Sequence, residues 1–385
     1  MKKIVGILAA AAVLATSVFA ADVSASTKIK GNLFSYDDAK TFALFTENND
    51  SHDYAQPNIT FSASDEKAGA TVKLSTDGSD KAVKMTTQTI WFKPVDAFKI
   101  TVGNFDVSLN QEQIKWTESV SKLGGNGFLF SVNVESFGLD LGLSQANGGN
   151  WFEKADGADD PTIKAFFVKA AYTADFGTIG GFVEFNRAAA DRKTYGNVDR
   201  FFGIADADRE ASFGANRLLW GPKAEGAIKD VFFGAGYRNN FDGIDLFVNL
   251  NGYMDDKFEW IRPEVYVSGS VDAFSYSAFV APFIALDSDV KDGYDAMYDA
   301  ELIDDKAFEC EVVAKVSYAL DGFTVYGQFF DTNILRRKFT STIELGASGS
   351  ISAMGWKTWL EINTGKGAEK DKVAVAVPFE LTFNF

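Results

Sequence analysis

Apolar and polar positions alternate along most of the chain, and the last thirteen residues are the most informative example. Apolar side chains occupy every odd position from Val373 to Phe385, and small or polar side chains occupy the even positions between them. In a β-strand this spacing places one row of side chains on each face. The segment is therefore predicted to be a strand with one apolar face and one face suited to water.

The same alternation recurs in other segments. Residues 244–253 alternate Ile, Leu and Val with Asp and Asn, and residues 128–135, 308–317 and 356–363 follow the same pattern. Each segment is close to the roughly 9 to 11 residues that a tilted strand needs to cross a bilayer. They are therefore predicted to be membrane-spanning strands.

Short turns alternate with longer connections along the chain. The longer connections are predicted at residues 35–54, 105–126, 145–161, 188–227 and 286–306. The short turns are predicted at residues 65–69, 94–97, 135–138, 174–177, 240–243, 271–274, 320–322 and 353–355. Short turns on one side of the membrane and longer loops on the other are typical of a transmembrane barrel.

The turns give a strand count. Eight turns join sixteen strands, and a first and a last strand bring the total to eighteen. Sixteen is the rival count, because residues 59–63 and 85–93 alternate least clearly. A sheet in lipid must close to leave no unpaired edge, and a ring of this size has a lumen too wide for side chains to fill. The predicted fold is an all-β, transmembrane, antiparallel up-and-down β-barrel around a water-filled channel.

The first twenty residues have a different pattern. Lys2 and Lys3 precede an apolar stretch that ends at Phe19 and Ala20. This pattern is typical of a secretory signal peptide, and the stretch is shorter than the roughly 20 residues of a membrane-spanning helix. Residues 1–20 are therefore predicted to be a signal peptide and residues 21–385 the barrel.

The charge of the chain limits its partners. The formal net charge of −16 becomes −18 when the two lysines of the signal peptide are removed. Phosphate contacts need clustered Lys and Arg, so nucleic acid is not an expected partner. The single cysteine, Cys310, allows no intrachain disulfide and lies among apolar strand positions.

Together these features resemble the outer-membrane porins of bacteria with two membranes. Phe379, Phe383 and the terminal Phe385 resemble the signal by which such barrels reach the barrel-assembly machinery. The resemblance covers the mature chain but includes no substrate-specific motif. It implies outer-membrane lipid around the barrel, both termini in the periplasm, passive diffusion of small hydrophilic solutes, frequent assembly as homotrimers, and a pore narrowed by an infolded loop.

Charged residues on the polar faces of the strands are the candidate pore lining. Four of the seven bases precede residue 100, so bases favour one wall, and a transverse field across the pore is expected unless the charges merely pair. The excess of acids predicts a preference for cations. The bases are Lys28, Lys30, Lys73, Lys99, Arg262, Lys315 and Lys357, and the acids are Glu135, Asp140, Glu184, Asp245, Glu264, Glu309, Glu311, Glu344, Glu361 and Glu380.

Two connections are candidates for an infolded, constricting loop. Residues 105–126, the third long connection, occupy the position that the constriction loop has in general porins. Residues 188–227 form the longest connection. The alternative is that both connections are surface loops and neither folds into the barrel. The constriction candidates are Gln113, Lys115 and Glu118 in the first, and Arg209 and Arg217 in the second.

Other chemistry is weakly indicated. Residues 206–210 and 287–289 resemble fragments of calcium sites, although acidic loops are usually solvated, and no other cofactor is expected. The only histidine, His52, is flanked by residues that point in other directions, so the chain is not expected to be an enzyme. The alternatives to a diffusion channel are a platform for adhesive loops, or a sugar-selective channel with a track of aromatic residues: Phe247, Tyr266, Tyr326 and Trp359.

Overall fold

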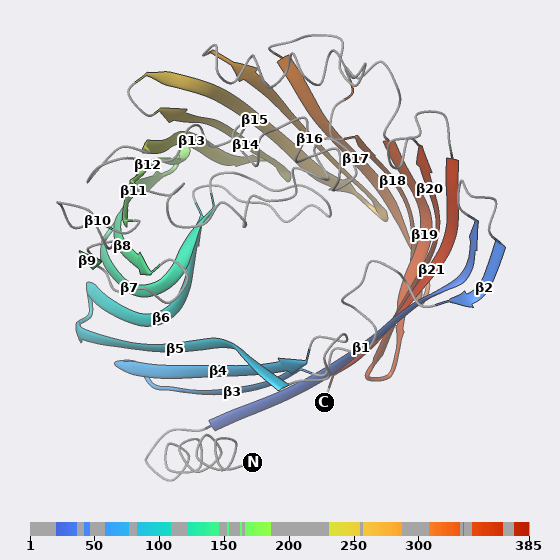
Figure 1. Cartoon of the computed structure of the whole chain (residues 1–385), viewed down its shortest axis with the longest axis horizontal. Coiled ribbons are helices and arrows are strands. Elements are labelled where there is room, and N and C mark those ends of the chain that lie inside the picture. The colour runs from blue at the N-terminus through green and yellow to red at the C-terminus, as the bar shows by residue number, and fades with distance from the viewer. Residues whose placement is uncertain are drawn as a thin grey trace.

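The described part of the chain folds as a closed antiparallel β-barrel (Figure 1). No helix in this part is both long and apolar enough to cross a membrane. The structure is a computed structural model, and it describes residues 21–36, 42–46, 58–76, 83–108, 122–145, 152–153, 162–163, 166–185, 231–254, 257–286, 308–331, 334, 341–364 and 373–384.

The first half of the ring contains the long strand β1, six strands joined in pairs by short turns, and three short pieces. In chain order the strands are β1 (Ala21–Tyr36), β2 (Phe42–Thr46), β3 (Asn58–Ser64), β4 (Ala68–Thr76), β5 (Val83–Val95), β6 (Phe98–Ser108), β7 (Lys122–Val134), β8 (Phe137–Gln145), β9 (Phe152–Glu153) and β10 (Thr162–Ile163). β9 and β10 pair only with each other, as a separate two-stranded sheet.

The second half of the ring continues the same up-and-down order. Its strands are β11 (Phe166–Ala174), β12 (Gly177–Phe185), β13 (Val231–Phe241), β14 (Ile244–Met254), β15 (Phe258–Val271), β16 (Phe274–Ala285), β17 (Phe308–Leu320), β18 (Phe323–Asp331), β19 (Ser341–Ile351), β20 (Met354–Thr364) and β21 (Val373–Asn384).

The ring closes where its first and last strands meet. β21 pairs with β1 from Ser26↔Asn384 to Tyr36↔Val375, and the two ribbons lie side by side in Figure 1. β3 pairs with the first residues of β1, and β2 pairs with the last ones, on the same edge. The nineteen strands of the sheet therefore occupy eighteen positions around the ring. This confirms the predicted eighteen strands, and the rival count of sixteen is wrong.

All eight predicted turns join neighbouring strands at one end of the barrel. Both described chain ends lie at this short-turn end, because Ala21 pairs with Ala63 next to the β3–β4 turn and the Asn384 amide donates to the Ala353 carbonyl in the β19–β20 turn. At the opposite end the strands extend farther than predicted. β2 and the ends of β1, β6 and β7 fall within segments that the sequence assigned to connections, because backbone pairing continues past the apolar part of each strand.

Some turns place a side chain in strained backbone. Glu135, between β7 and β8, has a φ of 50°, a left-handed conformation that glycine adopts without steric cost. We expect Glu135→Gly to raise the free energy of unfolding by about 0.5–1 kcal/mol, measured by urea unfolding of the barrel in lipid vesicles. The matched control is Asp321→Gly in the β17–β18 turn, because Asp321 is outside this conformation. A Glu135→Gly barrel less stable than the wild type would contradict this expectation.

The two faces of the sheet differ in exposure. On β14 the apolar Ile244, Val248 and Leu250 are 42%, 40% and 46% exposed, whereas Asn249 and Asn251 on the other face are 1% and 0% exposed. On the face that carries Asn249, Arg262 of β15 contacts Glu311 of β17 across the intervening strand β16. Side chains converge in this way on the concave side of a curved sheet. The polar row is therefore the inner face, and the exposed apolar row is the outer face.

Candidate functional site

The strands place the predicted pore-lining charges on one face, the inner one. This inner row contains Lys28, Lys73, Lys99, Asp140, Glu184, Asp245, Arg262, Glu264, Glu311, Lys315, Glu344, Lys357, Glu361 and Glu380. The backbones of Lys30 and Glu309 occupy the same row, but their side chains are outside the described ones.

Glu135 is the one candidate that the structure removes from the row. It lies in the two-residue turn between β7 and β8, and its left-handed backbone ends the alternation of faces there. The sequence interpretation extended the strand one residue too far.

Several other candidates fall outside the described residues. They are the constriction candidates Gln113, Lys115, Glu118, Arg209 and Arg217, the acidic loops proposed for calcium, and His52. Among the residues that are described, no group of three His, Cys, Asp or Glu side chains has the geometry of a metal site.

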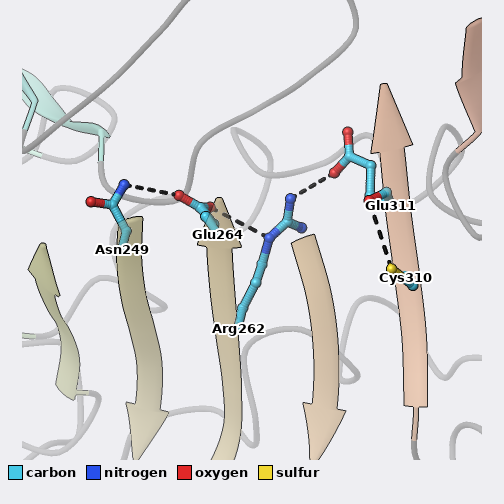
Figure 2. A network of polar contacts seen from close by, with 5 residues as sticks. All are labelled: Asn249, Arg262, Glu264, Cys310 and Glu311. Carbon is cyan, nitrogen blue, oxygen red and sulfur yellow. Dashed lines mark hydrogen bonds and ion pairs between the residues drawn. The ribbon is translucent and has the colours of Figure 1, made fainter. Parts of the chain in front are cut away.

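A buried polar network crosses the inner face of four neighbouring strands (Figure 2). The Asn249 amide donates to Glu264 Oε2 at 3.2 Å, and the Arg262 guanidinium lies 3.5 Å from Glu264 Oε1. The same guanidinium donates through Nη2 to Glu311 Oε2 at 2.6 Å. Arg262, Glu264 and Glu311 are 2%, 0% and 3% exposed, so the network is shielded from water.

A small side chain makes room for this network. Arg262 belongs to β15 and Glu311 to β17, and the inward residue of β16 opposite Glu311 is Ala281. Because its methyl group is short, the guanidinium can pass over it. Buried charges are tolerated only when they are paired and hydrogen-bonded, so the Arg262–Glu311 contact stabilises both.

Further ion pairs connect neighbouring strands at less buried positions. Lys28 Nζ lies 3.2 Å from Glu380 Oε1 across the β1–β21 closure, and Lys169 Nζ lies 3.5 Å from Asp140 Oδ2. Sequence reasoning missed Lys169, although it occupies the inward position opposite Asp140. The residues around Lys169 in the sequence are apolar on both faces of the strand, so the alternation of polar and apolar positions is not visible there.

Arg238 was also missed. Its Nε and Nη2 donate to the two carboxylate oxygens of Asp245 at 3.2 and 2.7 Å, a paired geometry typical of Arg with a carboxylate. The sequence could have indicated Arg238 as an inward residue, because it lies two residues before the Asn240–Gly243 turn, on the same face of β13 as Asn240. Asp245 is therefore already engaged by a cation.

Aromatic side chains cover much of the inner face from β11 to β16. Phe247 stacks on Tyr266 with ring centroids 5.1 Å apart, and Trp260 lies 5.2 Å from Phe283. A Cβ at Gly142 would lie 2.1 Å from the Phe167 ring, so glycine is needed there. The sequence predicted a water-facing row along this wall, but the structure has an apolar layer with buried charges. The buried rings are Phe167, Phe182, Phe232, Phe247, Tyr253, Trp260, Tyr266, Phe279 and Phe283.

Elsewhere on the inner face, lysines lie over aromatic rings. Lys357 Nζ is 4.9 Å from the Tyr326 ring centroid and 4.6 Å from that of Trp359, and Lys99 Nζ is 4.8 Å from that of Trp91. Cations in this position are attracted by the ring's quadrupole while they stay in contact with water. On β1 and β3 to β6 the described inner face carries fewer buried aromatic side chains than the aromatic wall does.

Comparison with known proteins gives structural likeness only. No protein-family model matches the chain, and no curated protein does. A mutant porin from Rhodobacter blastica is similar at a TM-score of 0.47 and 12% identity, covering 95% of this chain and 100% of that one. OpdQ from Pseudomonas aeruginosa is similar at a TM-score of 0.48 and 11% identity, covering 94% and 99%. At these values the likeness carries no statement about what passes through the barrel.

Proposed function

We propose that this porin-like barrel is an outer-membrane channel for passive diffusion of small hydrophilic solutes and ions. The main support is the pairing of an exposed apolar outer face with a charged inner face in a closed ring of eighteen strands. Lipid can surround such an outer face, and a ring of this size leaves room for water inside. The short turns and both described chain ends would then face the periplasm. Assembly machinery and a homotrimer remain predictions from the sequence.

Solute passage has a direct test. Proteoliposomes with the refolded barrel should swell in isotonic solutions of small sugars, at rates that fall as the sugar becomes larger. A filled or closed barrel would give the swelling rate of empty liposomes. A rate that saturates for one sugar, while other sugars of equal size pass freely, would favour a selective channel instead.

An aromatic sugar track receives no support from the ring geometry. Phe247 and Tyr266 stack on each other and are almost fully buried, so neither offers an open face. The rings of Tyr326 and Trp359 are also buried and are covered by Lys357. A sugar needs an exposed ring face to stack on.

The ion preference depends on which charges meet water. The count of acids on the inner face predicts a preference for cations, but four described acids there are almost fully buried: Glu184, Glu264, Glu311 and Glu344. A buried carboxylate is either paired or neutral, so it adds little to the potential in the pore. Only one described base of the inner face, Arg262, is buried to the same extent.

The inner-face charges that are not deeply buried predict the opposite ion preference. Among the described inner-face side chains outside that buried set, acids are outnumbered by bases: Asp22, Asp140, Asp245, Glu361 and Glu380 against Lys28, Lys73, Lys93, Lys99, Lys169, Arg238, Lys315 and Lys357. We therefore propose that the pore favours anions, the reverse of the preference expected from charge counting.

The reversal potential under a potassium chloride gradient measures this preference. We expect a reversal potential of the sign that marks chloride as the more permeant ion. Lys99→Glu should shift it towards potassium, because the described inner-face charges of β3 to β6, where Lys99 lies, are all bases. A wild-type reversal potential of the cation-selective sign would contradict the proposal and restore the count-based prediction.

A further inference from the structure

A recess on the inner face lies near the short-turn end of β15, β16 and β17. Its volume is about 360 Å³, which is within the range of small-molecule sites. The serines that line it are Ser268, Ser270, Ser275, Ser277 and Ser317, and Lys315 lies among them. Such a concentration of hydroxyl groups around one cation is not required by strand formation.

The register places these side chains in two short rows. Ser268 is opposite Ser277, and Ser277 is opposite Lys315, in one row across the three strands. Ser270, Ser275 and Ser317 form the next row in the same way. Directly opposite residues have Cβ atoms about 4.5–5.5 Å apart, so one small group can contact hydroxyls from two strands at once.

The donors of the recess are available. In the described part of the chain, no hydrogen bond or ion pair engages the five serine hydroxyls or the Lys315 ammonium, whose recorded contact is with the Tyr326 ring at 5.5 Å. Lys315 differs in this respect from four other inner-face bases, which each pair with a carboxylate: Lys28, Lys169, Arg238 and Arg262.

Lys315 is the charged residue among the described residues that line the recess, and none of these is acidic. The nearest inward acid on β14, Asp245, is opposite Ser268, but both of its oxygens already accept hydrogen bonds from Arg238. Lys357 adds a second ammonium over the same Tyr326 ring, which is opposite Ser317.

We propose that this recess is a binding subsite for a phosphate or sulfate group carried by a small solute, or for the free anion. Hydroxyl groups arranged on three strands can donate to several oxygens of a tetrahedral anion, and lysine supplies a point charge without the planar fork that suits a carboxylate. The proposal rests on the proposed function, because it places the subsite along the route of a diffusing solute.

Block of the chloride current by inorganic phosphate tests the subsite. Phosphate added to potassium chloride should reduce single-channel conductance with a saturating dependence on its concentration, and sulfate should do the same, whereas acetate should not. Lys315→Gln should raise the half-saturating phosphate concentration by roughly tenfold or more, the loss typical of a hydrogen bond to a charged group. Conductance that falls without saturation, or equally with acetate, would overturn the proposal.

Matched variants separate the recess from the general field of the pore. Ser277→Ala should raise the half-saturating concentration, and Ser277→Thr should restore it, because threonine keeps the hydroxyl. Lys99→Gln removes an inward base outside the recess and should change the half-saturating concentration far less than Lys315→Gln does. If Lys99→Gln acts as strongly as Lys315→Gln, the anion responds to the field of the whole pore and the subsite is wrong.

Failure of the channel itself is distinguishable from failure of the subsite. If the folded barrel does not conduct, the proposed function is wrong, and the subsite is then tested by phosphorus-31 line broadening of inorganic phosphate with the protein in detergent micelles. Broadening that Lys315→Gln removes would support the subsite in the absence of a channel. Equal line widths with wild type and variant would overturn it.

Discussion

Replacement of Arg262 by methionine is expected to destabilise the barrel by about 3–5 kcal/mol, because it leaves buried Glu264 and Glu311 without their shared cation. Methionine keeps most of the side chain's volume, so the loss reports charge rather than a cavity. The measurement is the midpoint and slope of urea unfolding in lipid vesicles, followed by tryptophan fluorescence.

Two companion variants show whether burial of the network is the reason. Lys169→Met removes a cation from the more hydrated pair with Asp140 and should cost no more than about 1 kcal/mol. Glu311→Gln combined with Arg262→Met should cost less than the sum of the two single changes, because both remove the same contact. Equal losses for Arg262→Met and Lys169→Met would mean that water reaches the network.

Ile59→Arg is expected to destabilise the barrel by about 2–4 kcal/mol, because it places a charge in lipid near the middle of the membrane. Ile59 is on the outer face of β3 and is 40% exposed, and the strand belongs to the segment with the weakest sequence alternation. The variant therefore tests both the outer face and the count of eighteen strands.

The neighbouring residue provides the control. Thr60 is on the inner face, directly opposite the inward Lys73, so Thr60→Arg should change stability by less than about 1 kcal/mol. Equal losses for the two variants in urea unfolding would show that β3 does not separate lipid from the lumen. A ring of sixteen membrane-spanning strands would then be the better account.

The fold was predictable because its signals are local. Alternation with a period of two identifies a strand and its two faces, and Asp–Gly pairs such as Asp242–Gly243 mark turns through the left-handed backbone that they adopt. β2 was missed because its signal is not local. Its five residues pair with the end of β1, and a pairing partner is not encoded in a short segment's own periodicity.

The candidate site was predictable only in part. Alternation places Glu264 and Glu311 on the inner face, but it does not tell whether that face meets water or is covered by aromatic rings. The contact of Arg262 with Glu311 depends on strand order, register and the small side chain of Ala281, which are properties of the folded sheet. Charge counting therefore gave too much weight to acids that are buried and paired.

The most direct test of the central claim is single-channel conductance of the refolded barrel in a planar bilayer. The account predicts large, stable current steps that grow in proportion to salt concentration, as expected for ions moving through water along a hydrated wall. A folded barrel that inserts but gives no steps would contradict the account, because its lumen would then be closed by its own interior.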